Sequence, residues 1–193
     1  MKYAIALSGG IASGKSTACS FLKLYGYGVI CADEVAHRVL EESQSEVVEV
    51  FGKEILEDSK INRKILGNIV FNDAIARKKL ENILHPKIKK EILKKAESLD
   101  KSEIPYFVDI PLFFETRNYE ISETLLIYTQ KEIQIERLMK RNHLSKEEAL
   151  KRIALQMPLD EKKKLASYVI DNSKGVESLQ AEIEKYLGNY LKK

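Results

Sequence analysis

Residues 9–17 read Gly9-Gly10-Ile11-Ala12-Ser13-Gly14-Lys15-Ser16-Thr17, and this stretch decides the fold. It matches the pattern G-x-x-x-x-G-K-[ST] of a phosphate-binding loop, or P-loop. Residues 3–8 before it form an apolar run of strand length, and residues 18–25 after it carry apolar side chains at helical spacing. A strand, a glycine-rich loop and a helix in this order predict that backbone N–H groups and the helix N-terminus bind a phosphate.

The side chains of the loop indicate what kind of phosphate compound is bound. Lys15 is expected to reach the β- and γ-phosphates of ATP, and the Ser16 hydroxyl is expected to ligate Mg²⁺. The alternative is a tight glycine turn without a ligand, which leaves Lys15 without a function. We therefore predict a nucleotide-binding segment made of Ala12, Ser13, Gly14, Lys15, Ser16 and Thr17.

Composition narrows the class of protein. A length of 193 residues indicates one domain with, at most, small inserted subdomains. The net charge of +3 is too weak to imply nucleic-acid binding, and no apolar stretch approaches the ~20 residues that span a bilayer. The N-terminus does not resemble a signal peptide, and the two cysteines, Cys19 and Cys31, give no disulfide framework. We expect a cytoplasmic protein with no nucleic-acid or membrane partner.

Five strand-like segments alternate with helical patterns along the chain. Near-continuous apolar runs favour parallel strands that are buried on both faces. This order predicts the α/β class, with a three-layer fold, a five-stranded parallel sheet and a ligand at the carboxyl ends of the strands. The predicted strands are residues 3–8, 28–31, 105–109, 125–129 and 168–170.

Two helical insertions are expected in this single domain of residues 1–193. Residues 34–100 are mostly helical, with Pro86 starting or kinking a helix, and are assigned to binding the phosphate acceptor. Residues 141–164 are assigned to a lid, and Ser145-Lys146-Glu147-Glu148 matches a capping box there. A P-loop core with such insertions is the layout of small-molecule kinases, in which a lid excludes water from the transferred phosphoryl group.

Three polar residues end or follow predicted strands, and each permits two interpretations. Asp33 is either the base that takes the proton of the acceptor hydroxyl or only the N-cap of a helix that starts at Glu34. Asp109 is either a carboxylate near Mg²⁺ or a strand-end turn residue. Asn172 is either beside the nucleobase or an ordinary turn residue.

A helix over residues 131–141 would place Gln134, Arg137 and Arg141 on one face. Two like charges four residues apart repel each other on a bare helix, and an anion such as the ATP phosphates would reverse that effect. The alternative is a solvated basic face. Arg152 and Gln156 repeat the polar pairing in the lid.

Taken together, these segments resemble the dephospho-CoA kinase family, in the family's order and over nearly the whole chain. The matching segments are the P-loop, Ala32–Ala36, Phe51-Gly52 with Ile55-Leu56, Asn62-Arg63 with Leu66, Val70-Phe71, Leu80–Pro86 with Ile88, Pro111–Glu115, Gln134 with Arg137-Leu138 and Arg141, Arg152-Ile153 with Gln156, and Val169-Ile170 with Asn172.

The resemblance implies transfer of the ATP γ-phosphate to the ribose 3′-hydroxyl of dephospho-CoA, with Mg²⁺, by an enzyme of a size that is often monomeric. It implies Asp33 as the base, and Lys15 and Arg141 as groups that stabilise phosphate charge. Arg137 and Asn172 are then expected beside ATP. The residues expected toward the acceptor are Arg63, His85, Pro111, Leu112, Phe113 and Glu115.

The sequence departs from the family pattern at two positions. Cys31-Ala32-Asp33 stands where the family commonly has Asp-Ala-Asp, so one carboxylate is missing. Ala12 stands where the loop usually has glycine, and we expect alanine to fit there only if its φ is negative.

Three other functions explain the sequence less well. Another small-molecule kinase would share the P-loop but would not explain His85-Pro86 or Phe113-Phe114-Glu115. A GTPase switch would need an Asn-Lys-x-Asp motif, which the sequence lacks. An inactive binding module is disfavoured because Lys15, Ser16 and Asp33 occur together.

Overall fold

The computed structural model describes residues 1–189, and the chain forms two compact units. The first unit holds residues 1–30 together with the chain from residue 96 onward, and the second holds residues 31–95. No helix within residues 1–189 is both long enough and apolar enough to cross a membrane.

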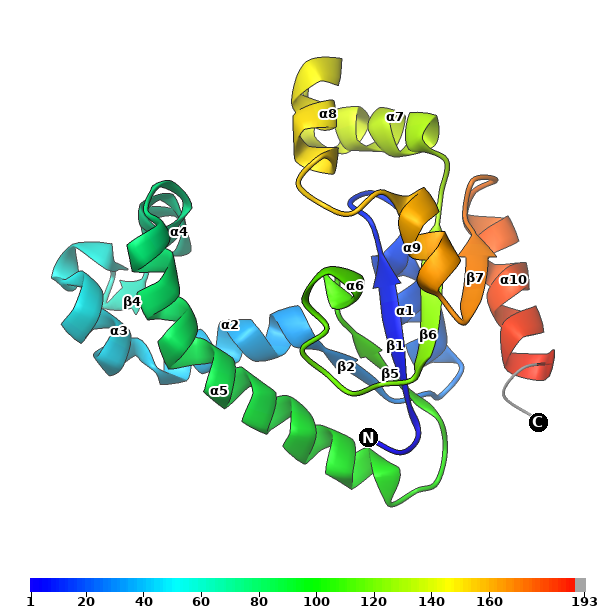
Figure 1. Ribbon diagram of the computed structural model, residues 1–193, viewed down its shortest axis with the longest axis horizontal. Coiled ribbons are helices and arrows are strands. Elements are labelled where there is room, and N and C mark those ends of the chain that lie inside the picture. Colours follow the sequence, from blue (N-terminus) through cyan, green and yellow to red (C-terminus); the bar gives the residue numbers. More distant parts are fainter. Residues whose placement is uncertain (190–193) are drawn as a thin grey trace. The chain divides into compact units, whose positions relative to one another are not determined.

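A five-stranded parallel sheet forms the centre of the first unit, in the order β2-β5-β1-β6-β7 (Figure 1). Each of the five predicted strands is present within one or two residues of its expected bounds, which confirms the α/β class. The strands are β1 (Ala4–Gly9), β2 (Val29–Cys31), β5 (Tyr106–Asp109), β6 (Glu123–Tyr128) and β7 (Tyr168–Asp171).

The central strand β1 sets the position of the loop. All six of its residues are buried, as expected for a strand covered on both faces. It pairs in parallel with β5 on one side and β6 on the other, so that Leu7 lies opposite both Asp109 and Leu125. The chain order of the strands therefore diverges at the carboxyl end of β1, where open α/β sheets bind their ligands.

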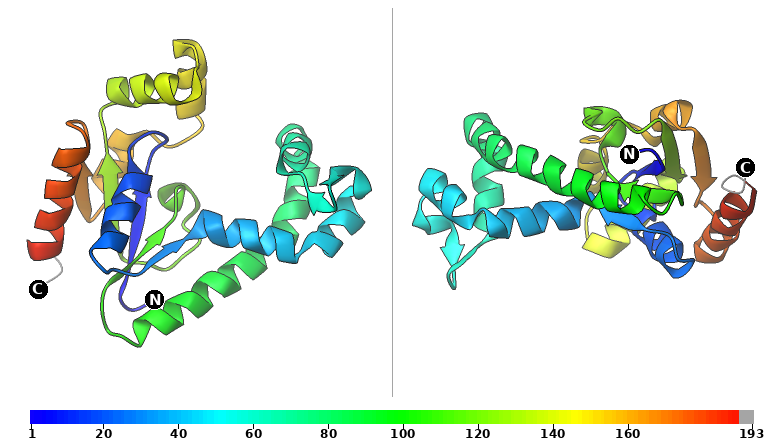
Figure 2. Two further views of the ribbon diagram at one scale, coloured as in Figure 1. Left: turned by 180° about the vertical axis from the view of Figure 1, so that it is seen from behind. Right: turned by 90° about the horizontal axis from the view of Figure 1, so that it is seen from below.

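Helices cover both faces of this sheet and give the predicted three layers. Helices α1 (Lys15–Leu24) and α10 (Val176–Asn189) lie side by side on one face (Figure 2). Helices α6 (Phe113–Thr116) and α9 (Leu159–Leu165) lie on the opposite face, against β1 and β6. Helices α7 (Lys131–Asn142) and α8 (Lys146–Ile153) follow β6 and pack on each other. The core includes Leu7, Leu22, Phe107, Leu125, Ile127, Ile183 and Tyr186.

The second unit is mostly helical, as expected for this segment. Its elements are α2 (Ala32–Glu42), α3 (Gln44–Phe51), the 3₁₀ helix η1 (Lys53–Ile55), β3 (Leu56–Glu57), β4 (Lys60–Ile61), α4 (Arg63–Asn72) and most of α5 (Ala74–Asp100). The β3–β4 hairpin was not predicted. Its strands have two residues each, too short for an alternating pattern, and its turn uses Asp58 and Ser59 at φ 49° and 62° without a glycine.

Pro86 does not start a helix, contrary to one of the two sequence interpretations. It lies inside α5, which begins at Ala74 and continues to Asp100. Proline removes one backbone hydrogen bond of a helix. Burial of Leu84 and Ile92 on the two sides of Pro86 favours a helix that continues through it.

Candidate active site

The P-loop connects β1 to α1 and needs glycine at its end. Gly14 is the N-cap of α1 and has a φ of +93°, in the left-handed region. A Cβ atom at Gly14 would lie 2.0 Å from Nδ2 of Asn172. The backbone conformation and the close approach of Asn172 therefore both require glycine here.

Ala12 has a φ of +60°, so the expectation that alanine fits here only with a negative φ is wrong. The left-handed conformation places Cβ close to the following carbonyl oxygen and costs an alanine roughly 1–2 kcal/mol. The loop therefore adopts the conformation that glycine would take at this position, and Ala12 carries the strain.

Lys15, the first residue of α1, forms an ion pair with Asp109 at the end of β5. The side chains are largely buried, at 14% and 7% exposed. The second oxygen of the Asp109 carboxylate accepts from the Cys19 Sγ at 3.4 Å. The structure thus places a carboxylate beside the P-loop lysine, which favours the interpretation of Asp109 as a site residue over that of a turn residue.

The other predicted residues of the loop differ in exposure. Ser16 is exposed and Thr17 is half-buried. Ser13 is fully buried, and its hydroxyl has no hydrogen-bond partner among residues 1–189. The backbone groups of Ser13 are also paired, since its N–H donates to the Gly10 carbonyl at 3.1 Å and its carbonyl accepts from Nδ2 of Asn172 at 2.8 Å. Contact between Ser13 and ATP stays a prediction.

Asn172 binds the backbone of the P-loop. Its Nδ2 donates to the carbonyl of Ser13 at 2.8 Å, and the residue is only 4% exposed. The backbone carbonyl of Asn172 accepts from the Arg137 guanidinium at 2.9 Å. This geometry gives Asn172 a definite role in shaping the loop, whereas contact with a nucleobase stays a prediction.

The three polar side chains predicted on one face of α7 have different environments, two bound to other parts of the protein and one at the surface. Arg137 is half-buried and tied to the chain after β7, whereas Arg141 is exposed and donates to Oδ1 of Asn142 at 2.9 Å. Gln134 is buried, and its carboxamide donates to the P-loop backbone rather than facing solvent with the arginines. Arg141 is thus left at the surface, where an anion can reach it.

The segment Pro111–Glu115 is anchored by a buried lysine that sequence analysis missed. Lys162 of α9 has no exposed surface, and its Nζ lies 2.8 Å from Oε1 of Glu115. The same ammonium donates to the carbonyls of Gly9 at 3.0 Å and Pro111 at 3.3 Å. Glu115 Oε1 also accepts from the backbone N–H of Met157 at 3.1 Å. Glu115 is therefore a structural anchor in this conformation.

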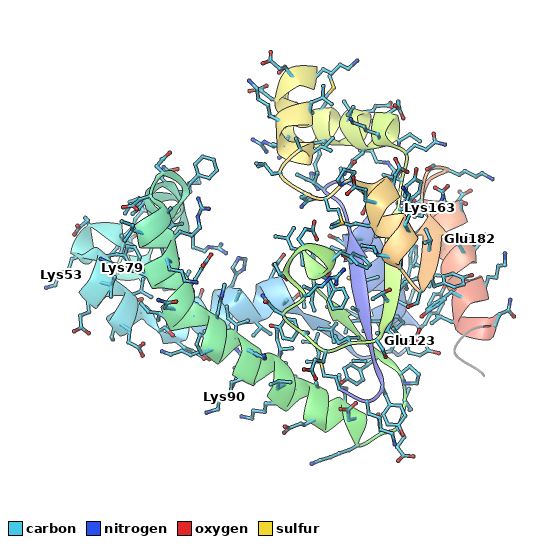
Figure 3. The ribbon with its side chains drawn as sticks, viewed as in Figure 1. Lys53, Lys79, Lys90, Glu123, Lys163 and Glu182 are labelled. Atoms are coloured by element: carbon cyan, nitrogen blue, oxygen red, sulfur yellow. The ribbon has the colours of Figure 1, made fainter. Side chains whose placement is uncertain are left out.

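One sequence signal could have identified Lys162. It belongs to Lys162-Lys163-Lys164, which looks like a solvated run, and Lys163 does extend from the surface of α9 (Figure 3). Lys162, however, lies three residues after the buried Leu159 and so shares its face of the helix.

The remaining residues of that segment have mixed environments. Phe113 and Phe114 are buried and meet edge to face, with ring centroids 5.5 Å apart. Leu112 is 40% exposed, and Pro111 is half-buried. Leu112 is therefore the side chain of this segment that is most available to a ligand.

Three predicted site residues belong to the second unit. Asp33 is exposed in the first turn of α2, which begins at Ala32 with Cys31 as its N-cap. The alternative that Asp33 is merely the N-cap is therefore wrong. Arg63 is exposed as the first residue of α4, and His85 is exposed on α5. All three side chains are accessible to a ligand.

Comparisons with known proteins agree on one family. The family described as dephospho-CoA kinase matches residues 3–178. A dephospho-CoA kinase of Sulfurimonas denitrificans is 50% identical, with 100% of this chain and 98% of that protein covered. The crystal structure of TT1252 from Thermus thermophilus has a TM-score of 0.82 at 34% identity, covering 97% of each chain. A dephospho-CoA kinase from Campylobacter jejuni has a TM-score of 0.74 at 37% identity, covering 99% of this chain and 98% of that one.

Proposed function

This chain belongs to the dephospho-CoA kinase family, and we propose that it transfers the γ-phosphoryl group of ATP to the ribose 3′-hydroxyl of dephospho-CoA. The observation that carries the proposal is the family match over residues 3–178 on a chain whose P-loop presents Lys15 at the carboxyl end of the central strand. We further propose that it acts as a cytoplasmic monomer on this small-molecule substrate, without a nucleic-acid partner.

The P-loop supports ATP as the phosphate donor. Backbone N–H groups of residues 12–17 and the N-terminus of α1 favour negative charge, and the Lys15 ammonium adds a full positive charge. We assign Lys15 and Arg141 to the charge that develops on the transferred group, and Arg137 and Asn172 to the nucleotide side of the site. Lys15 would exchange the Asp109 carboxylate for phosphate oxygens when ATP binds.

The donor set also fits Mg²⁺. This ion prefers oxygen ligands, keeps several waters and is typically held by one or two protein groups together with substrate phosphates. The exposed hydroxyl of Ser16 and the carboxylate of Asp109 are oxygen donors of this kind, from the first turn of α1 and the end of β5. When bound, Mg²⁺ would neutralise phosphate charge.

Proton removal is assigned to an exposed carboxylate, and acceptor recognition to exposed hydrogen-bond donors and apolar surface. An exposed carboxylate with freedom to reach a hydroxyl suits a general base, and Asp33 is such a group. Arg63 and His85 offer donors for the anionic acceptor, and Leu112 and the half-buried Pro111 offer apolar surface, whereas the buried Phe113 offers little. Glu115 enters this proposal only as the anchor of that segment.

The test is ADP release with Mg-ATP and dephospho-CoA, run beside AMP, CMP, dTMP and shikimate as acceptors. Turnover only with dephospho-CoA is the expected result. Turnover with a different acceptor would keep the kinase assignment and overturn the substrate. ATP binding with no turnover on any acceptor would contradict the proposed reaction.

A further inference from the structure

The peptide units on both sides of Ile11 in the P-loop are held by two glutamines from distant parts of the chain. The Nε2 of Gln134, on α7, donates to the Ile11 carbonyl at 2.6 Å. The Oε1 of Gln156, in the segment between α8 and α9, accepts from the Ile11 N–H at 2.8 Å. Because a backbone carbonyl only accepts and an N–H only donates, the orientation of both carboxamides is fixed.

This contact is built into the packing. Gln134 is 4% exposed, so its hydrogen bond forms away from competing water. A Cβ at Gly10 would lie 2.7 Å from the Gln134 Nε2 and 3.1 Å from Cγ of Leu159. Gly10 therefore leaves the space through which Gln134 reaches the loop.

The two glutamines act on the strained residue. The Ile11 carbonyl and the Ala12 N–H belong to one planar peptide unit, so fixing that carbonyl restricts φ of Ala12. Ala12 has a φ of +60°, and such a conformation persists only where surrounding contacts over-determine it. On the other side of Ala12, Asn172 holds the Ser13 carbonyl at 2.8 Å.

We propose that Gln134 and Gln156 are positioning residues that hold the P-loop in its phosphate-binding conformation by clamping Ile11, and that Gln156 thereby ties the lid segment to the loop. Neither side chain has to contact ATP for this role. The inference rests on the proposed binding of ATP at the P-loop. In this proposal Gln134 and Gln156 bind the backbone of the loop, whereas Arg137 and Arg141 keep their assignment to the phosphates.

The decisive experiment compares the same substitutions at the two positions, with the dissociation constant of ATP measured by titration calorimetry. Methionine keeps the approximate volume of glutamine without a carboxamide. Gln134→Met and Gln156→Met should each weaken ATP binding by about tenfold, since each leaves a backbone group unpaired. The KM for the acceptor and the melting temperature without ATP serve as controls. A melting temperature that falls while the ATP affinity stays at the wild-type value would show a merely structural role.

Glutamate distinguishes the two residues because a carboxylate accepts but does not donate. Gln156→Glu keeps an acceptor for the Ile11 N–H and should bind ATP more tightly than Gln156→Met, despite its added negative charge. Gln134→Glu places a carboxylate against the Ile11 carbonyl and should bind ATP no better than Gln134→Met. The same ranking at both positions would overturn the inference.

A double variant tests the link to Ala12. Ala12→Gly removes the cost of the left-handed conformation, so it should restore several-fold of the ATP affinity lost in Gln134→Met while changing the wild-type affinity less. Equal effects of Ala12→Gly in both backgrounds would contradict the coupling. Failure of the wild-type protein to bind ATP would instead overturn the proposed function.

Discussion

The buried ammonium of Lys162 lies 2.8 Å from the carboxylate of Glu115, and it also donates to the carbonyls of Gly9 and Pro111. One side chain thereby joins the end of β1, the segment after β5 and α9. The arrangement satisfies the three donors of the ammonium, which a buried charge requires. The second oxygen of Glu115 is buried without a hydrogen-bond partner among residues 1–189, so Lys162 is the main compensation for that carboxylate.

We predict that Lys162→Met destabilises the protein strongly. Removing one partner of a buried ion pair leaves the other charge uncompensated and costs about 3–5 kcal/mol. Chemical denaturation would measure this loss, with Lys164→Met as the matched control, because Lys164 is exposed on the same helix. Equal, small effects of both substitutions would show that Glu115 finds another partner.

Glu115→Gln separates the two roles of Glu115. If Glu115 is an anchor, the substitution should lower the free energy of unfolding. It should leave the KM for dephospho-CoA within about twofold of the wild-type value, since the residues proposed to contact the acceptor are unchanged. Denaturation and steady-state kinetics on the same preparation measure both quantities. A large rise in KM with unchanged stability would restore the sequence prediction that Glu115 contacts the acceptor.

We predict that Ala12→Gly stabilises the protein by about 1 kcal/mol. The folded state is relieved of the left-handed alanine, and the greater entropy of glycine in the unfolded chain offsets part of that gain. Thermal unfolding without nucleotide measures the change. Ala154→Gly, at a helix C-cap with an ordinary right-handed backbone, is the control that should destabilise. A loss of stability in Ala12→Gly would mean that alanine is not strained in solution.

Asp33→Asn should leave ATP affinity near the wild-type value and lower turnover by roughly 10²–10⁴-fold, because an amide cannot take the proton of the acceptor. The measurement is kcat with saturating ATP and dephospho-CoA, beside calorimetric binding of ATP. Glu34→Gln is the control, as an exposed carboxylate in the same helical turn. Wild-type turnover in Asp33→Asn would remove Asp33 from the catalytic residues.

The pH dependence of the stability of α8 is predicted from Glu148. The backbone N–H and the hydroxyl of Ser145 donate to its carboxylate at 2.8 Å and hold its pKa below the ordinary 4.5. Because the pKa of Glu148 is lower in the folded than in the unfolded chain, its ionised carboxylate stabilises α8 at pH values above the unfolded pKa. This contribution is lost as the pH falls through the folded pKa. A carbon NMR titration should give a Glu148 midpoint below 4.5 that rises toward it in Ser145→Ala. A Glu148 midpoint at or above 4.5 would contradict the capping box in solution.

Several features of the fold were predictable because their signals are local. The P-loop, the five buried strands and the Ser145–Glu148 capping box each occupy a short stretch, where residue type limits the backbone directly. The order of these segments resembled that of the dephospho-CoA kinase family, and the family match over residues 3–178 confirms the resemblance. The β3–β4 hairpin was not predicted because strands of two residues give no alternating pattern. The sequence left open whether Pro86 starts or kinks a helix, and burial of Leu84 and Ile92 on its two sides favours the continuous helix.

The contacts that shape the site could not be predicted in the same way. Gln134, Gln156, Lys162 and Asn172 are each more than a hundred residues from the P-loop groups that they bind. Glutamine, lysine and asparagine are mostly exposed in folded proteins, so residue type does not mark a buried one, and only Lys162 had a local signal in its helical spacing from Leu159. The sequence by itself determined that a phosphate loop starts an α/β fold, since glycine spacing and apolar runs act on neighbouring atoms. Only the tertiary structure decided that Ala12 is left-handed and which distant side chains hold it, because those depend on packing between segments that sequence order does not bring together.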